Sequence, residues 1–540
     1  MLSLKIDDTI VDLPDDFSFT MNLKSPIFGE VGSYSYPFKL PNTPRNATLL
    51  GFRHRVENIT DLYHDEKGIF LWNSLNLFQG TVRLKTLTTK AFEGSLFEGV
   101  GDFFYERKNA SLQDVNFGEM IFEDDTDKFS FINSCTNSVY PAKDMSFPNI
   151  LNKSYFEELP VNEGLHYFNV YINSLIPKVF SGGSVRTIVV PMLYIRFVLK
   201  KIFEHLKYTF DDTFFSSDSD FNSLALFNLV DCNSGTYGYF IYDDLKIYLN
   251  YHVPRISFSD FFLGLETFFN IRFFINNATG IVKLLSIDNI INSNDYIEFS
   301  KQVISVVTEI EDRITGYHLK MTVETNDDNY AFKKEQDELH LGRLKESVQS
   351  LSDLNPWPSD DIMDQRWVID ENCYYILWSN KLWVQWYENI DLYMEYVYRT
   401  RQEVIETKFS TLLNYNDGDY AIIGNARVDW KTVTGKIFFT KFNDNGSTDN
   451  VIAIPTTDNN SLYWGGENGL FNKHYKAFLD FRMATKFVKI VKQMSYMELK
   501  EFDFSRKIMV NGIKYLVKNL QVTIKKDRIM PALLECYTCN

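Results

Sequence analysis

The chain has 540 residues, of which 45% are hydrophobic and 16% are aromatic, and its formal net charge is −16. This length predicts several domains with cores of their own, and the acidic balance argues against a protein that grips nucleic acid by its phosphates. The five cysteines are scattered, so we expect a reduced protein without a disulfide framework. No apolar run reaches the roughly 18 residues of a membrane-spanning helix, and the first residues carry no basic or apolar leader, so neither a membrane span nor a signal peptide is expected.

The first distinctive element is the segment 25–52, SPIFGEVGSYSYPFKLPNTPRNATLLGF. Its aromatic residues alternate with polar residues or proline, which is the period of a half-buried strand. Its prolines are expected to exclude a helix and to disfavour a central strand. We therefore predict an extended edge strand that runs into an ordered arm and contacts another subunit. The residues expected at that interface are Tyr34, Tyr36, Phe38 and Pro41.

Two regions follow from the spacing of strand and turn residues. Residues 1–110 alternate short apolar runs with Gly or polar turns, the rhythm of a small β-barrel or sandwich. Residues 111–184 contain an acidic run from Glu123 to Asp127 and are expected to form a connector or insertion with weak regular structure.

The region 185–300 is predicted to be an α/β domain with two helix-plus-β units. Pro191 is expected to open the first helix, because the apolar residues that follow it have helical spacing. A second helix is predicted from Ser257, which is suited to cap it together with Asp260. A hairpin with its turn at residues 276–280 follows the second helix.

The last third of the chain returns to β structure. Strands are predicted over residues 301–345, and 346–470 are rich in Trp and Tyr. In 471–540, Asn511-Gly512 stands between alternating apolar residues and predicts a β-hairpin, because both residues tolerate positive φ. The core residues expected in 301–345 are Val306, Val307, Ile310, Ile314 and Met321.

The tryptophans of residues 357–386 allow two interpretations. Trp383 and Trp386 suit a platform that stacks on glycan rings, and the alternative is an aromatic core or a subunit interface. A hydrolase is disfavoured, because adjacent carboxylates such as Asp211-Asp212 face opposite ways on a strand.

Metal and redox chemistry have weak candidates. Cys536-x-x-Cys539 has the spacing of a redox pair or half a zinc site, but the sequence offers no second cysteine pair, and a structural role is favoured. His54 and His64 lie near acidic residues, where solvated polar loops are favoured over a metal site. We expect no enzyme activity, no catalytic residue, no cofactor and no metal.

Three stretches resemble the baseplate hub, or tail-associated, structural proteins of tailed phages, of the type that infects Bacteroidetes. They are GSYSYPFKLPNTPRNATLLGF with FQGTVRL and FEGSLFEGVGDFF, then FSDFFLGLETFFNIRFFINNATGIVKLLS, and finally FDFSRKIMVNGIKYLVKNLQVTIKK. The resemblance implies an α+β, mostly β, multidomain chain with two tube-like β-barrel or sandwich domains and α/β inserts. These two domains would be residues 1–110 and a discontinuous domain of 301–345 plus 471–540, with 346–470 as an added Trp/Tyr-rich domain.

The resemblance also implies a function. Such hubs are trimers whose two tube-like domains per chain form a pseudo-sixfold ring between the tail tube and the tail tip. The implied partners are further copies of the chain, the tail tube protein, the tip or spike protein, the tape-measure protein, and DNA that passes without specific binding. The implied location is the virion tail, after synthesis in the host cytoplasm. The alternative is a peripheral tail or adhesin protein that binds host-surface glycans.

Overall fold

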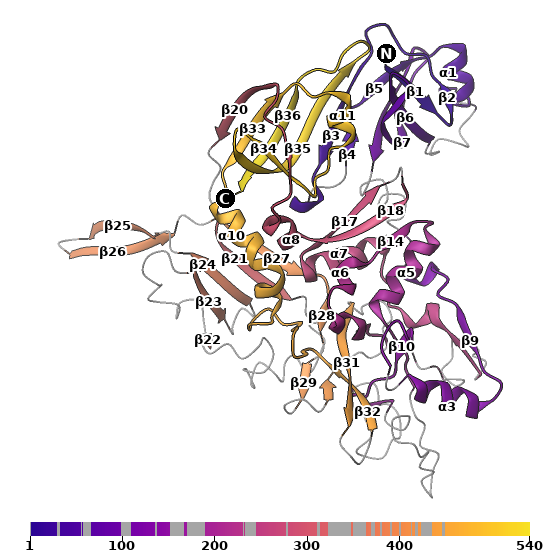
Figure 1. Cartoon of the computed structure of the whole chain (residues 1–540), viewed down its shortest axis with the longest axis vertical. Helices are drawn as coiled ribbons and strands as arrows, with labels where there is room; N and C mark the ends of the chain where they lie inside the picture. Colours follow the sequence, from indigo (N-terminus) through magenta and orange to yellow (C-terminus); the bar gives the residue numbers. More distant parts are fainter. Residues whose placement is uncertain are drawn as a thin grey trace, which may run out of the picture. The chain divides into compact units, whose positions relative to one another are not determined.

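Figure 1 shows the computed structural model of the chain, in which the fold is mostly β, with 43% strand. Among the described residues no sheet closes into a barrel, and no helix is long and apolar enough to cross a membrane. The described residues are 2–29, 33–55, 57, 66–98, 110–135, 138–151, 167–169, 189–230, 232, 245–276, 279–309, 314–321, 347–348, 363–368, 373–378, 381–388, 391–398, 401–411, 413–415, 420–422, 435–444 and 449–539.

The chain divides into two compact units, each discontinuous in sequence. Unit 1 comprises Met1–Lys108, Arg272–Asp312 and Ala477–Asn540, and unit 2 comprises Asn109–Ile271 and Arg313–Lys476. The five-part division expected from the sequence stays a prediction.

Unit 1 is built mainly from strands. Its elements are β1 (Leu2–Ile6), β2 (Thr9–Ile10), β3 (Ser18–Lys24), the 3-10 helix η1 (Pro26–Phe28), β4 (Ser33–Ser35), β5 (Phe38–Pro41), α1 (Pro44–Leu49), β6 (Glu66–Trp72), β7 (Leu75–Leu87), β8 (Ala91–Glu98), β17 (Ile271–Asn276), β18 (Ile281–Ser286), α8 (Ile287–Asn292), β19 (Tyr296–Glu298), β20 (Val303–Glu309), α10 (Lys476–Ala484), β33 (Phe487–Lys492), α11 (Tyr496–Lys500), β34 (Lys507–Val510), β35 (Ile513–Lys525) and β36 (Ala532–Cys539).

One 14-stranded sheet joins the two ends of the chain. Its main path runs β2-β1-β6-β7-β8-β4-β3-β35-β36-β33-β20, and β5, β19 and β34 attach beside it. The N-terminal and C-terminal strands meet where β3 pairs antiparallel with β35, from Ser18 opposite Lys525 to Lys24 opposite Asn519. Because β3 pairs with the C-terminal set of strands, these 14 strands form one open sheet instead of the separate barrels that were one form of the prediction.

The larger of two apolar clusters of buried residues in this sheet draws on both ends of the chain. It combines N-terminal residues such as Phe19 and Phe70, whose rings stack at 3.8 Å, with C-terminal residues such as Val522 and Leu534. Each fully buried side chain of this size contributes about 1.5–3 kcal/mol to folding. The two ends of the chain therefore fold as one body.

Two sets of strands within the sheet follow the same order. The first set runs β3·β4·β8·β7·β6 and the second runs β20·β33·β36·β35·β34. In each set a two-residue turn leads into a 13-residue strand with a register shift, β7 or β35. Unit 1 therefore contains a structural repeat.

The turns of the repeat use the same backbone conformation. Asn511 and Gly512 have φ of 52° and 81°, so the predicted hairpin between β34 and β35 is confirmed. Asn73 and Ser74 have φ of 51° and 68° between β6 and β7. A short helix with a hydroxyl cap precedes each hairpin, α1 in the first set and α11 in the second.

Unit 2 mixes short helices with small sheets. Its elements are the 3-10 helix η3 (Leu112–Asp114), β9 (Glu119–Ile121), α3 (Asp125–Ser134), β10 (Met145–Ser146), β11 (Ile150–Leu151), β12 (Tyr167–Phe168), β13 (Met192–Leu193), α5 (Ile195–His205), β14 (Thr209–Asp211), α6 (Thr213–Ser216), η4 (Ser219–Ser223), β15 (Leu224–Leu226), β16 (Lys246–Tyr248), η5 (Leu249–His252), α7 (Phe258–Phe269), β21 (Ile314–Met321), β22 (Ser347–Val348), β23 (Met363–Val368), β24 (Cys373–Trp378), β25 (Lys381–Glu388), β26 (Asp391–Tyr398), β27 (Arg401–Thr407), β28 (Ser410–Thr411), β29 (Leu413–Tyr415), β30 (Tyr420–Ile422), β31 (Lys436–Asp444), β32 (Asp449–Ile454) and the π-helix η7 (Phe471–Tyr475).

Both helices predicted from apolar spacing are present in unit 2. Helix α7 begins after Ser257, whose hydroxyl accepts a hydrogen bond from the Asp260 backbone N–H at 3.0 Å, as predicted. Helix α5 begins at Ile195 and not at Pro191, because Met192 and Leu193 pair with β10. Pairing to a neighbouring strand thus overrides the helix-start preference of proline.

Candidate assembly site

The segment 25–52 contains less extended backbone than predicted, because it includes two short helices. Pro26 and Pro44 occupy the first turns of η1 and α1, where the missing N–H costs nothing, so the expectation that the prolines exclude a helix was wrong. The hydroxyl of Thr43 caps α1 by accepting from the Asn46 N–H. Strand β4 lies between β8 and β3, so it is an inner strand and not an edge.

The four residues predicted at a subunit interface lie in different environments. Tyr34 and Pro41 are half-buried, and Tyr36 is 41% exposed. Phe38 is 3% exposed and packs edge-on against Phe70 at 5.3 Å in the core of unit 1. The pattern changes face at residues 36–37, which lie outside the strands, so the alternation is not continuous. A role of these residues between subunits stays a prediction.

Tyr34 belongs to a row of cationic and aromatic side chains that crosses neighbouring strands. Lys24 Nζ lies 5.9 Å from the centre of the Tyr34 ring, and the Tyr34 and Phe97 rings are 6.5 Å apart. The Arg83 guanidinium lies 4.7 Å from the Phe97 ring, and Tyr36 meets Tyr34 edge-on at 5.8 Å. Contacts of this kind contribute about 0.5–1 kcal/mol each at exposed sites. They order the exposed Tyr36 beside a half-buried tyrosine.

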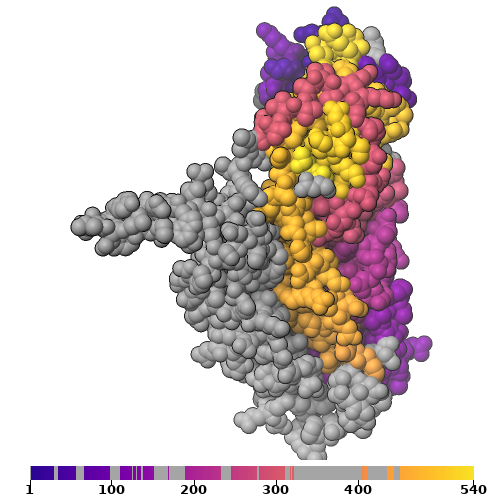
Figure 2. All heavy atoms as spheres, turned by 60° about the vertical axis from the view of Figure 1, so that its left-hand side comes forward, coloured from indigo at the N-terminus to yellow at the C-terminus, as the bar shows by residue number. Residues whose placement is uncertain are grey.

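The described strand with the most exposed apolar surface is β20. It has one described neighbour, β33, and Figure 1 draws it as the outermost strand of this sheet. Ile304 is 60% exposed, Val306 42% and Val307 52%, and residues near 300 lie on the visible surface in Figure 2. The prediction that Val306 and Val307 are core residues was therefore wrong.

The burial of β20 explains this correction. Val306 and Val307 are neighbours and so point to opposite faces, yet both are exposed, because the strand ends the described sheet. Of the other predicted core residues, Met321 is half-buried, the Ile314 side chain is not described, and Ile310 lies outside the described residues. The sequence signal for such an edge is the run of β-branched residues on both faces, VISVV, without the polar alternation of a half-covered strand.

The predicted glycan-stacking tryptophans lie on a two-stranded hairpin. Strand β25 pairs antiparallel with β26, with Trp383 opposite Tyr396 and Trp386 opposite Tyr393. The structure describes the backbone of these positions and not their side chains. Contact of Trp383 and Trp386 with a glycan stays a prediction.

The candidate redox and metal residues are dispersed. Cys536 is in the main core of unit 1, whereas Cys539 packs against a second cluster beside Leu516 and Tyr537. Residues three apart on a strand face opposite ways, so the two thiols point apart, and burial raises the pKa of Cys539 to about 11. His64 lies outside the described residues, and within those residues no group of three His, Cys, Asp or Glu side chains could hold a metal ion.

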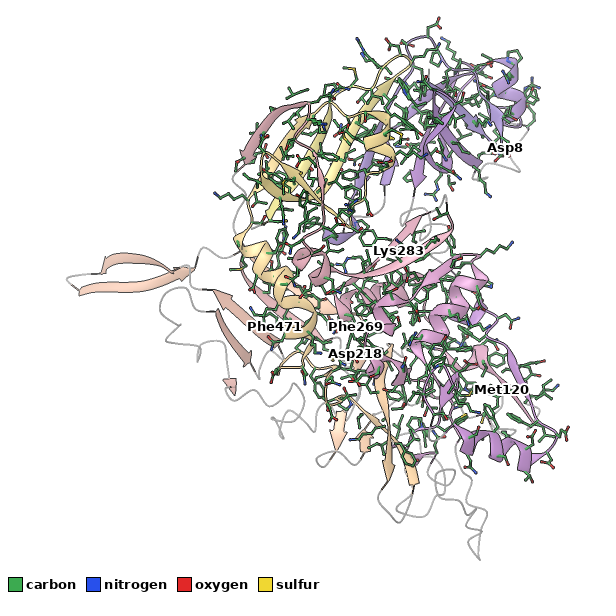
Figure 3. All side chains as sticks on the ribbon, in the orientation of Figure 1. Asp8, Met120, Asp218, Phe269, Lys283 and Phe471 are labelled. Carbon is green, nitrogen blue, oxygen red and sulfur yellow. The ribbon has the colours of Figure 1, made fainter. Side chains whose placement is uncertain are left out.

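Two buried histidines in unit 2 were not anticipated. Burial lowers the pKa of both His252 and His474 to about 3. The His474 ring meets the Phe269 ring edge-on at 5.4 Å, and Figure 3 labels Phe269 and Asp218 in this part of the unit. His474, neutral at physiological pH and packed against phenylalanine rings, is suited to packing rather than to proton transfer.

No family model and no curated protein matches the chain. Among solved structures, the 43 kDa tail protein of prophage MuSo2 from Shewanella oneidensis is 6% identical with a TM-score of 0.33, covering 99% of this chain and 95% of that one. Prophage tail protein gp18 from Listeria monocytogenes EGD-e is 6% identical with a TM-score of 0.33, covering 100% and 94%. The tail protein from Neisseria meningitidis MC58 is 7% identical with a TM-score of 0.30, covering 99% and 95%. All three are described as tail proteins, and two of them are prophage proteins.

Proposed function

We propose that the chain is a structural protein of a phage virion tail, a hub that forms a ring between the tail tube and the tail tip and lets the genome pass. Its work is assembly and not catalysis. The proposal starts from the three stretches of sequence that resemble tail hub proteins.

The observation that carries the proposal is the repeat in unit 1. The resemblance implies two tube-like β domains in each chain, so that three chains present six similar elements. Two strand sets of identical order, β3·β4·β8·β7·β6 and β20·β33·β36·β35·β34, lie side by side in one sheet through the β3·β35 pairing. Such a duplicated element within one chain supports a threefold ring that matches a sixfold tube.

The open sheet and the acidic charge support the same proposal. A sheet whose last described strand is the apolar β20 has an edge suited to a permanent oligomer. A net charge of −16 suits a channel through which DNA slides without binding. The proposed partners are two further copies of this chain, the tail tube protein, the tip or spike protein and the tape-measure protein.

Imaging of assembled particles tests the proposal. The chain would carry a small tag, particles would be purified from the producing cells, and the tag would be located by electron microscopy. We expect three copies at the junction of tube and tip. A tag on peripheral fibres, or purified virions that lack the chain, would contradict the proposed role.

A further inference from the structure

The exposed strand β20 has a well-defined counterpart in its own unit. Strands β3 and β20 each have seven residues and each pairs antiparallel with the next strand of its set, β4 or β33. Met21 and Val306 are the fourth residues of these strands. They therefore hold equivalent positions in the repeat.

Residues that lie opposite one another across each strand set show that Val306 is less covered than its equivalent. In the first set Met21 lies opposite Ser35, whose hydroxyl accepts from the Leu96 N–H, and Leu96 lies opposite Val82. In the second set Val306 is opposite Ile490, Ile490 opposite Leu534, and Leu534 opposite Leu520. The exposed fraction of Met21 is 1% and that of the other six partners is 0%, whereas that of Val306 is 42%.

The difference in exposure between Met21 and Val306 comes from the strand on the far side of β3. Met21 is buried because β3 has a second neighbour, β35, in which Val522 lies opposite Met21. Val522 is the tenth residue of the 13-residue strand β35. In the first set the equivalent strand is β7, and its tenth residue is Leu84.

Strand β7 also lacks a partner on one side at this place, among the residues that the structure describes. Its neighbour β6 pairs with it only as far as Val82, and β8 lies on the other side. The stretch Leu84–Leu87 therefore continues past β6 among the described residues. Leu84 and Leu87 are half-buried at the margin of the core.

We propose that β20 of one copy pairs antiparallel with β7 of the next copy, repeating between chains the β3·β35 contact made within each chain. The same register places Val303–Val306 opposite Leu87–Leu84, with Val306 beside Leu84. The occupant is a second copy of this chain, because the β3·β35 contact within unit 1 already joins the equivalent pair of strands. The paired segments carry one charge, Lys85, so no like charges meet.

This contact is heterologous, since β20 of each copy meets β7 of another. Repeated, it closes into a ring if the rotation per copy allows, and otherwise gives an open filament. The inference deepens the proposed function, on which it rests for the number of copies, by naming the strands that join one copy to the next.

Disulfide trapping on the full-length chain tests this register. Ser305 and Lys85 would lie opposite each other, with Cα atoms about 4.5–5.5 Å apart, within disulfide range. We expect the Ser305→Cys, Lys85→Cys double variant to give intermolecular disulfides in most chains on oxidation, seen on non-reducing gels. Each single variant controls for the native cysteines. Ser305→Cys with Thr89→Cys, four residues and about 13 Å off register, should give at least tenfold less product.

The outcomes separate the contact from the function. Oligomers that form without this disulfide, or with equal product from the off-register pair, overturn the proposed contact. They do not contradict the proposed role as a tail hub. The in-register disulfide in particles or oligomers unconnected with a tail supports the contact and contradicts the hub. If the first pair disturbs folding, as seen by circular dichroism, Val303→Cys with Leu87→Cys tests the same register, and its failure in a folded chain also overturns the contact.

Discussion

The two strand sets of unit 1 share an order of strands but differ at their ends. Strand β3, at the end of the first set, also pairs with β35, whereas β20, at the end of the second set, has no further partner among the described residues. The difference appears in one pair of equivalent residues, Met21 at 1% exposure and Val306 at 42%. The second set has the same strands as the first, but its last strand leaves apolar side chains exposed. A sheet that is extended by a strand of another subunit has such an edge.

The largest expected effect comes from placing a charge at both equivalent positions. Met21→Lys should destabilise unit 1 by about 3 kcal/mol or more, because the ammonium would be buried without a partner. Val306→Lys should change the free energy of unfolding by less than about 0.5 kcal/mol but should weaken self-association, since charged edge strands resist pairing. Urea unfolding and sedimentation velocity measure the two effects.

Met497→Lys is the matched control, because Met497 is 53% exposed and lies on α11, outside the two strands of the proposed contact. It should leave both stability and self-association unchanged. The comparison of the two strand sets breaks down if Val306→Lys unfolds the chain as Met21→Lys does, or if it assembles like the control.

A smaller effect distinguishes the helices of the two sets. In α11 the Glu498 carboxylate accepts from the Ser495 N–H at 2.8 Å and pairs with buried Lys492 at 3.0 Å, whereas α1 has the uncharged Asn46 at the same helix position. Burial raises the pKa of Glu498, but the hydrogen bonds from Ser495 and Lys492 outweigh it, and the pKa lies below its usual value.

Glu498→Gln should therefore cost about 1 kcal/mol at pH 7, after allowance for solvent screening. A lowered carboxyl pKa gives stability that is present above the ordinary value near 4.5 and is lost as pH falls through the folded pKa. The cost should thus be smaller at an acidic pH below 4.5 than at pH 7. Denaturant unfolding at both pH values measures it, with Glu501→Gln, exposed at the end of the same helix, as control. An equal cost at both pH values would show that the carboxylate charge is not the cause.

The smallest effect concerns the turns. Ser74 has φ of 68° where the equivalent Gly512 has 81°, and a residue with a Cβ is strained in this region. Ser74→Gly should stabilise unit 1 by about 0.5 kcal/mol, and Gly512→Ser should destabilise it by about 1 kcal/mol. Thermal unfolding of both variants would test this. Changes of the same sign would mean that the two turns are not equivalent.

Local signals in the sequence predicted local structure well. Asn511-Gly512 marked its hairpin and Ser257 marked the start of α7, because turn and cap chemistry act over a few residues. The β3·β35 pairing joins residues about 500 positions apart, and no local pattern encodes it. The exposure of Val306 depends on whether a strand lies beyond β20, so an apolar run alone suggested a core position.

The assembly segment was predicted in part for the same reason. The alternation of Tyr34, Tyr36 and Phe38 indicated a strand, but residues 36–37 interrupt it and send Phe38 into the core. The repeat itself has a sequence trace that is visible once the strands are known. An asparagine begins both turns, in Trp72-Asn73-Ser74-Leu75 and in Val510-Asn511-Gly512-Ile513.

Native mass spectrometry of the unmodified full-length chain at micromolar concentration tests the central claim most directly. The account predicts a closed species of three copies, which Val306→Lys converts to monomer while the Met497→Lys control remains trimeric. A wild-type chain that stays monomeric across this concentration range would contradict it.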